Sequence, residues 1–130
     1  MASILRVDTL TDASSNNSTA MSTINQGTAK AWLNFNGTGT IAERDSFNVS
    51  SLDDESTGKY GVNFSSAMSN VNYAITGLSG GTDNDQNISL EATSNHTPTT
   101  SLYRIVNRQC SNNTIEDSSF VLSSVLGDLA

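Results

Sequence analysis

Short runs in which apolar residues occupy every second position, separated by polar turns, are the feature that most restricts the fold of this chain. In the clearest run, Ala31, Leu33 and Phe35 take alternate positions, as the two-residue period of a β-strand requires. Asn36 and Gly37 follow directly and form a strong tight-turn signal. The pattern therefore predicts strands joined by sharp turns.

Several short strands at spacings of roughly 8–12 residues indicate a sandwich or barrel. The expected strands lie at residues 4–10, 30–35, 47–52, 59–64, 72–78, 87–92, 101–107 and 119–126. Segments 47–52 and 59–64 form the clearest hairpin, across a polar turn at 53–58 in which Gly58 can take a positive φ. No window of useful length shows the 3.6-residue apolar period of a helix. We expect an all-β fold, an antiparallel β-sandwich or barrel-like module.

An N-terminal arm is expected to precede the β-domain. Residues 4–10 read as a strand, and residues 11–19 form an apolar-poor linker. We therefore divide the chain into an arm and polar linker at 1–25 and a β-domain at 26–130. An isolated strand leaves its backbone groups unpaired, so residues 2–10 are expected to dock outside their own body, on a neighbouring subunit or a larger particle. The candidate assembly residues of this arm are Ile4, Leu5, Val7 and Leu10.

Serine, threonine and asparagine make up 51 of the 130 residues, and only 35% of the chain is hydrophobic. Such a chain is either disordered or a β-protein with polar outer faces and many turns. The alternating apolar runs favour the β-protein. Because small domains bury a smaller fraction of their surface, the core must be thin. A subunit interface would supply the missing apolar burial, so we expect an oligomer.

The formal net charge of −7 argues against two classes of partner. A sequence-independent nucleic-acid binder needs basic residues to neutralise phosphates, and anionic lipid attracts basic segments. No apolar run approaches the length of a membrane-spanning helix. We expect no nucleic-acid partner and no membrane insertion. Cys110 is the single cysteine, so no intrachain disulfide is expected.

The sequence patterns that would indicate catalysis or metal binding are incomplete at particular residues. His96 is the single histidine, in a turn before Pro98, and no nucleophile elbow accompanies it. Residues 83–87 begin like a calcium loop, but Ile88 stands where glycine belongs and Ser94 where the terminal glutamate belongs. Carboxylate pairs at 43/45 and 53/55 do not reveal a spatial acid–base pair. We expect no enzyme activity, no metal and no cofactor.

Four aromatic side chains and three polar loops are the remaining candidates for binding. Trp32, Tyr60, Tyr73 and Tyr103 could stack on sugars, but their strand positions favour packing in the core or at an interface. Binding function tends to lie on loops held by a rigid scaffold. The candidate receptor-facing residues in such loops are Asp83, Asn84, Asp85, Asn95, His96, Asn112 and Asn113.

Several stretches of the chain resemble fibre and appendage proteins of marine tailed bacteriophages. They are QGTAKAWLNFNGTGT at 26–40, RDSFNVSS at 44–51, GKYGVNF at 58–64 and AMSNVNY at 67–73. Shorter matches are Arg104-Ile105, Phe120-Val121 and Gly127-Asp128. The strong part covers about a third of the chain, and its specificity comes from several stretches together.

The resemblance implies a virion structural protein, a homotrimer with a β-rich fold and a role in host attachment. It implies no catalytic residues. The expected partners are further copies of the chain, other virion proteins and a polysaccharide or protein of the host surface.

Two departures from the family stand out: an acidic turn at 53–55, and some 25 residues before the β-domain where a long tail fibre has a shaft. A short fibre or knob-like subunit is thus the first hypothesis, and a capsid decoration (cementing) protein or a stand-alone carbohydrate-binding module are the alternatives. The first two would place the chain in the virion, as a tail appendage or on the capsid surface.

Overall fold

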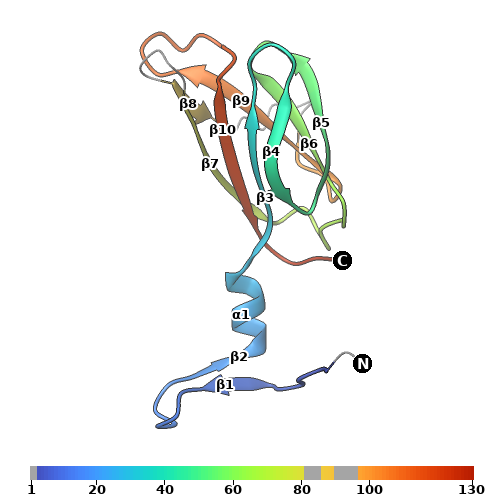
Figure 1. Ribbon diagram of the computed structural model, residues 1–130, viewed down its shortest axis with the longest axis vertical. Helices are drawn as coiled ribbons and strands as arrows, with labels where there is room; N and C mark the ends of the chain where they lie inside the picture. The colour runs from blue at the N-terminus through green and yellow to red at the C-terminus, as the bar shows by residue number, and fades with distance from the viewer. Residues whose placement is uncertain (1–2, 81–85, 90–96) are drawn as a thin grey trace.

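The computed structural model describes residues 3–80, 86–89 and 97–130, and its main body is a β-sandwich of two antiparallel four-stranded sheets (Figure 1). Sheet I has the strand order β4-β3-β10-β7, and sheet II has the order β5-β6-β9-β8. Sheet I consists of β3 (Ala29–Asn36), β4 (Ala42–Phe47), β7 (Ala74–Gly80) and β10 (Phe120–Leu126). Sheet II consists of β5 (Val49–Ser56), β6 (Lys59–Phe64), β8 (Gln86–Ser89) and β9 (Leu102–Gln109). The expected all-β fold is confirmed.

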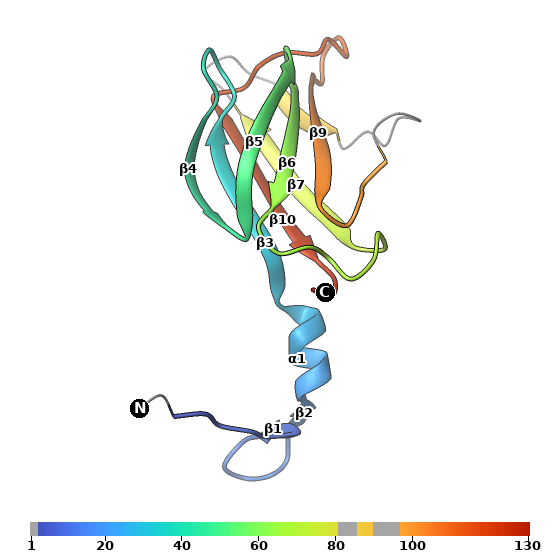
Figure 2. The same cartoon turned by 90° about the vertical axis from the view of Figure 1, so that its right-hand side faces the viewer.

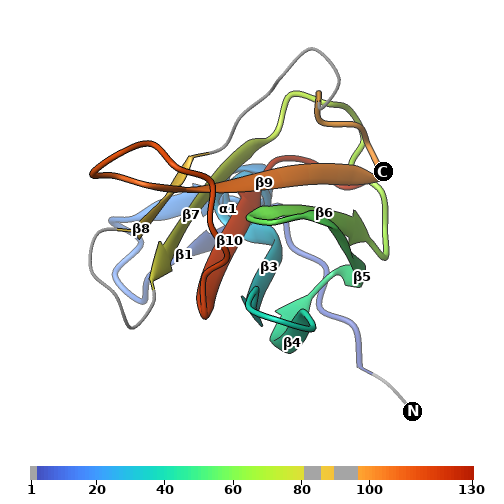
Figure 3. The same cartoon turned by 90° about the horizontal axis from the view of Figure 1, so that it is seen from above.

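The N-terminal arm, which we define as residues 3–27, projects from one end of this body. It contains a small hairpin of β1 (Thr9–Thr11) and β2 (Ser18–Ala20), followed by α1 (Met21–Gly27). Figures 1 and 2 show α1 on the long axis of the molecule, leading directly into β3. Viewed from the opposite end, which we call the distal end, α1 lies behind the centre of the body (Figure 3).

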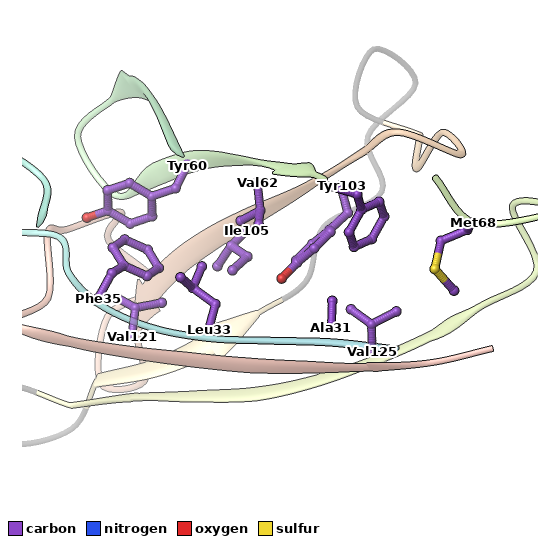
Figure 4. Packing of buried hydrophobic residues seen from close by; sticks show 11 residues of the cluster. Ala31, Leu33, Phe35, Tyr60, Val62, Met68, Tyr103, Ile105, Val121 and Val125 are labelled. Carbon is purple, nitrogen blue, oxygen red and sulfur yellow. The ribbon is translucent and has the colours of Figure 1, made fainter. Parts of the chain in front are cut away.

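The core lies between the two sheets and is built from the inward rows of four central strands (Figure 4). In each of these strands every second side chain points inward, as the strand pleat requires. The core members that are at most 2% exposed are Ala31, Leu33, Phe35, Tyr60, Val62, Met68, Tyr103, Ile105, Val121 and Val125. Phe35 meets Tyr60 edge to face at 5.0 Å between ring centroids, a geometry that adds about 0.5–1.5 kcal/mol to the burial term.

Two buried tyrosine hydroxyls find hydrogen-bond partners, so that neither is stranded in the core. The hydroxyl of Tyr103 pairs with the hydroxyl of Ser123 across the sandwich at 2.8 Å. The hydroxyl of Tyr60 lies 2.9 Å from the carbonyl oxygen of Gly37 and 3.0 Å from a carboxylate oxygen of Asp117. Sequence reasoning placed both tyrosines in packing roles, and their complete burial confirms it.

Asn48 forms the corner at which the chain crosses from sheet I to sheet II, between β4 and β5. Its φ is +57°, a left-handed conformation that Asn adopts more readily than most residues. Its side-chain amide donates to the carbonyl of Lys30 at 3.0 Å and to the carbonyl of Ser66 at 3.1 Å. Its side-chain oxygen accepts from the backbone N–H of Ser66 at 2.7 Å. The expected single strand at 47–52 is therefore wrong, because the backbone turns at Asn48.

Three further expectations are corrected by the structure. Of the predicted strand at 4–10, only Thr9 and Leu10 lie in a strand, and residues 11–19 belong to a closed hairpin rather than to a linker. The expected turn at 53–58 shortens to its last residues because β5 continues to Ser56, although Gly58 does take a positive φ of +64°. The helix α1 was not expected, and it spans the boundary drawn at residue 25.

Replacing Asn48 by alanine should lower the free energy of unfolding by about 2–3 kcal/mol, because three hydrogen bonds and a favourable left-handed residue are lost together. Asn48→Gly should cost about 1 kcal/mol less than Asn48→Ala, since glycine accepts the positive φ without strain. Denaturant unfolding measures both. Asn113→Gly is the control, at an exposed loop position with φ +62°, and should change stability by less than about 0.5 kcal/mol. Equal costs for Asn48→Gly and Asn113→Gly would show that the Asn48 side chain does not stabilise the corner.

Stability should fall at alkaline pH because burial raises the pKa of all three tyrosines. It raises the pKa of Tyr103 to about 12 and that of Tyr73 to about 12, and it raises the pKa of Tyr60 well above its usual value, helped by the carboxylate of Asp117. Below about pH 10 the tyrosines are protonated in both states, and above it the unfolded chain releases protons that the folded chain retains. Stability is thus full below pH 10 and is lost as the pH rises toward 12.

Denaturant midpoints measured from pH 8 to pH 11.5 test this alkaline loss. Buried Tyr103 alone should contribute a slope that peaks at about 1.1 kcal/mol per pH unit near pH 11. Tyr103→Phe keeps the ring but removes the titrating group, so its stability should decline less steeply than that of the wild type. Parallel pH profiles for the two proteins would contradict the assignment.

Candidate functional site

The N-terminal arm leaves its apolar side chains in solvent. Ile4 is 76% exposed and Leu5 is 81% exposed, while Val7 and Leu10 are also exposed. No strand of the arm pairs with the described strands of the body. A two-stranded hairpin is at best marginally stable on its own in water. The four candidate assembly residues thus form an apolar segment without a covering surface in the described chain.

The hairpin is held locally by Asp12, which explains why residues 11–19 are not an open linker. The carboxylate of Asp12 accepts from the backbone N–H groups of Ser14 and Asn16 at 3.1 and 3.0 Å. It also accepts from the side chains of Asn17 at 2.7 Å and Ser14 at 2.9 Å. The hydrogen bonds from the Asn17 and Ser14 side chains are the main causes that lower the pKa of Asp12. An Asx-type turn of this kind depends on short polar side chains.

Helix α1 lacks the features that stabilise a short helix by itself. It has seven residues, none of them buried, no side-chain cap at Ala20, and no acidic residue in its first turn or basic residue in its last. Isolated helices shorter than about 12–15 residues are marginal in water. Met21 and Ile24 lie three residues apart and therefore share one face of the helix. Packing of this face against another chain would supply the missing stabilisation.

Lys30 fixes the end of α1 to the body. Its side chain is buried, and its ammonium group donates to the carbonyl of Asn25 and to the hydroxyl of Thr28, the latter at 2.8 Å. The backbone N–H of Thr28 closes the helix by donating to the carbonyl of Ile24 at 3.1 Å. The arm therefore leaves the body in a defined direction.

The distal end carries loops that a buried network holds in place. The backbone N–H of Gly58 donates to the Asp117 carboxylate at 2.7 Å, and the backbone N–H of Gly37 donates to the carbonyl of Ser118 at 2.8 Å. Tyr60 contacts both Gly37 and Asp117. Gly58 has room only for hydrogen, because a Cβ there would lie 2.6 Å from the carbonyl oxygen of Glu116. Three loops from both sheets are thereby tied together.

Of the predicted receptor-facing residues, only two fall in the described chain. Asn112 and Asn113 lie in the exposed β9–β10 loop at the distal end (Figures 1 and 2). The Asn112 side chain accepts from the backbone N–H of Thr114 at 2.9 Å, and Asn113 donates its backbone N–H to Gln109 at 2.9 Å. Asp83, Asn84, Asp85, Asn95 and His96 lie outside the described residues.

Carboxylates of the sequence pairs 43/45 and 53/55 have ordinary structural partners. Glu43 accepts from the hydroxyl of Ser46 at 2.7 Å, and Asp53 accepts from the Asn63 amide at 2.8 Å. Glu55 pairs with Arg104 on the outer face of sheet II. Within residues 3–80, 86–89 and 97–130, no three His, Cys, Asp or Glu side chains gather as a metal site would require, and no helix is long and apolar enough to cross a membrane.

Comparison with known proteins leaves the fold as the basis of interpretation. The chain matches no protein-family model, no curated protein and no solved structure.

Cysteine cross-linking tests whether α1 meets a second α1. In a Cys110→Ser background, Ile24→Cys should form an interchain disulfide under mild oxidation, because its side chain lies on the apolar face of the helix. Ser22→Cys, two residues away, points to a different side and is the matched control. Non-reducing gel electrophoresis reads out the cross-linked species. Equal cross-linking at both positions, or none at Ile24, would contradict pairing through this face.

Proposed function

We propose that this chain is a structural subunit of a bacteriophage particle, a short fibre or knob-like protein that attaches the particle to its host. The observation that carries the proposal is the difference between the two ends of the molecule. One end has an arm of exposed apolar residues, and the other end has polar loops on a rigid sandwich. The sequence resemblance to phage fibre proteins supplies the biological setting.

In this proposal the arm and α1 mediate assembly. Ile4 and Leu5 are apolar residues exposed to solvent, and burying them against another chain would be favourable. The copies associate as homotrimers, as the resemblance implies, and the arm reaches other virion proteins.

The distal loops serve recognition in the same proposal. Binding loops act best when a scaffold fixes their positions beforehand, because less conformational entropy is lost on binding. The Tyr60–Asp117 network supports such a role for two loops. The loop at 110–119 is rich in hydroxyl and amide side chains, and the loop at 37–41 carries the hydroxyls of Thr38 and Thr40. These groups suit the hydroxyls of a polysaccharide or the backbone of a surface protein. The proposed role of this end is binding, without a chemical step.

Copy number in purified particles tests the proposal directly. Quantitative mass spectrometry should find a few tens of copies for a tail appendage, whereas hundreds would assign the chain to capsid decoration. Absence from the particle would overturn both assignments.

Deleting residues 3–20 should leave the body folded and reduce incorporation into particles. The core is formed entirely by residues after this segment, so circular dichroism and thermal unfolding should change little. Ser18→Ala, at an exposed position of β2, is a control within the same arm and should incorporate normally. A deletion variant that incorporates as well as the wild type would contradict the assembly role of the arm.

A further inference from the structure

The outer face of sheet I carries more large apolar side chains than the outward face of a sandwich sheet usually does. Antiparallel sheets commonly present polar residues to solvent. On sheet I, Leu78 is 57% exposed and Phe47 is 51% exposed, and Trp32, Phe120 and Leu126 are also exposed. They come from all four strands of the sheet.

The strand register shows that these residues form one continuous surface. Phe47 lies directly opposite Trp32, and Leu78 lies directly opposite the half-buried Leu122. Side chains opposite each other on antiparallel strands are about 4.5–5.5 Å apart at Cβ and contact one another. Ser124 joins the two groups, since it pairs with Trp32 on one side and with β7 on the other.

A shallow depression of about 360 Å³ lies in this face between β7 and β10. Leu78 and Leu122 form its apolar wall, and Thr76 and Ser124, whose hydroxyls are hydrogen-bonded to each other at 2.9 Å, form the other side. A depression beside exposed aromatic rings suits the insertion of a large side chain from a partner protein.

The outer face of sheet II is different in chemistry, although both sheets cover the same core. Its exposed side includes an Asp53–Asn63 hydrogen bond and the Glu55–Arg104 ion pair. These groups satisfy one another in solvent. Among the sheet residues whose side chains the structure describes, the exposed large apolar ones therefore lie on sheet I.

A protein suits this face better than a sugar. The leucines at 78, 122 and 126 offer no hydrogen-bond partner, so sugar hydroxyls placed against them would lose water without compensation. Protein interfaces, in contrast, are enriched in aromatic residues and depleted of charge at their centres.

Position favours a second copy of the chain as that protein, and the charge of this face allows it. Each copy carries a net charge of −7, so two copies repel unless they meet through a charge-poor surface. The centre of the sheet I face, at Trp32, Leu78 and Leu122, is such a surface. Of the charged residues of this face, Asp45 lies on the edge strand β4, and the guanidinium of Arg44 lies 4.4 Å from the ring centroid of Phe120, away from that centre. The face also continues from β3 through Lys30 toward α1. Copies that meet here in parallel would bring their α1 helices to the same end.

We propose that the outer face of sheet I, centred on Trp32, Leu78 and Leu122, is a self-association surface that packs against a second copy of this chain. The inference rests on the self-assembly part of the proposed function and assigns it a surface beyond the arm. Parallel copies are joined both through their arms and along the sides of their sandwiches.

Trp32 is the single tryptophan of the chain, so wild-type fluorescence reports on this face without any substitution. Sedimentation and tryptophan emission should be measured over the same dilution series of the full chain. As the mass falls to that of the monomer, Trp32 emission should shift to longer wavelength and become more accessible to acrylamide. Dissociation with unchanged emission would place the contact elsewhere and overturn the inference.

A matched pair of substitutions supplies the second arm of the test. Leu78→Asp places a charge on the face and should weaken self-association, raising its dissociation constant Kd at least tenfold, as loss of a central interface residue does. Val71→Asp adds the same charge at an exposed loop position and should change Kd by less than about twofold. Circular dichroism checks that both variants are folded, and the wild-type emission series stands on its own if Leu78→Asp does not fold.

The outcomes separate this inference from the broader proposal. If Leu78→Asp associates like the wild type while Ile24→Cys still cross-links, the arm alone joins the copies and the sheet I face is not an interface. A wild-type chain that stays monomeric at tens of micromolar would overturn self-association altogether. The presence of the chain in particles, measured independently, would then still decide the virion role.

Discussion

Phe35 of sheet I packs edge to face on Tyr60 of sheet II at 5.0 Å, and much of the molecule depends on this contact between the sheets. With only 35% hydrophobic residues, the chain can fill little more than one inward row on each central strand. Tyr60 does two things in this thin core. Its ring packs, and its hydroxyl reaches Gly37 and Asp117, so the same residue that closes the core also positions the distal loops.

The strands that sequence reasoning located best are those whose alternation directly reflects burial. The segment at 59–64 coincides with β6, and 30–35 and 119–126 differ from β3 and β10 by one residue at each mismatched end. In β3 and β6 the buried row is more apolar than the outward row, so side-chain polarity shows the period of two. In β10 the outward row is apolar as well, so its apolar content and not an alternation marks the strand. Packing roles for Tyr60 and Tyr103 followed from the same alternation.

Other features depended on information that the local pattern does not hold. Strand β4 is on the edge of sheet I, and its Glu-Arg-Asp centre is exposed, so no alternation marks it. Helix α1 is only seven residues long and lacks caps. The crossing at Asn48 looks like continuous strand because Phe47 and Val49 are both apolar, although they belong to different sheets. The apolar outer face emerges only when Trp32 and Leu78, far apart in sequence, are brought together by strand register.

The position of β10 between β3 and β7 has a consequence for how the protein is made. Phe35 on β3 pairs with Val121 on β10, so sheet I cannot form completely while residues 120–126 are still inside the ribosome. Pairings between distant segments of this kind fold slowly, and they leave apolar strands open to other chains in the meantime. A truncated chain that ends before β10 would have an arm but no finished sheet I face. Only a chain synthesised through Leu126 can therefore present the surface through which copies are proposed to join.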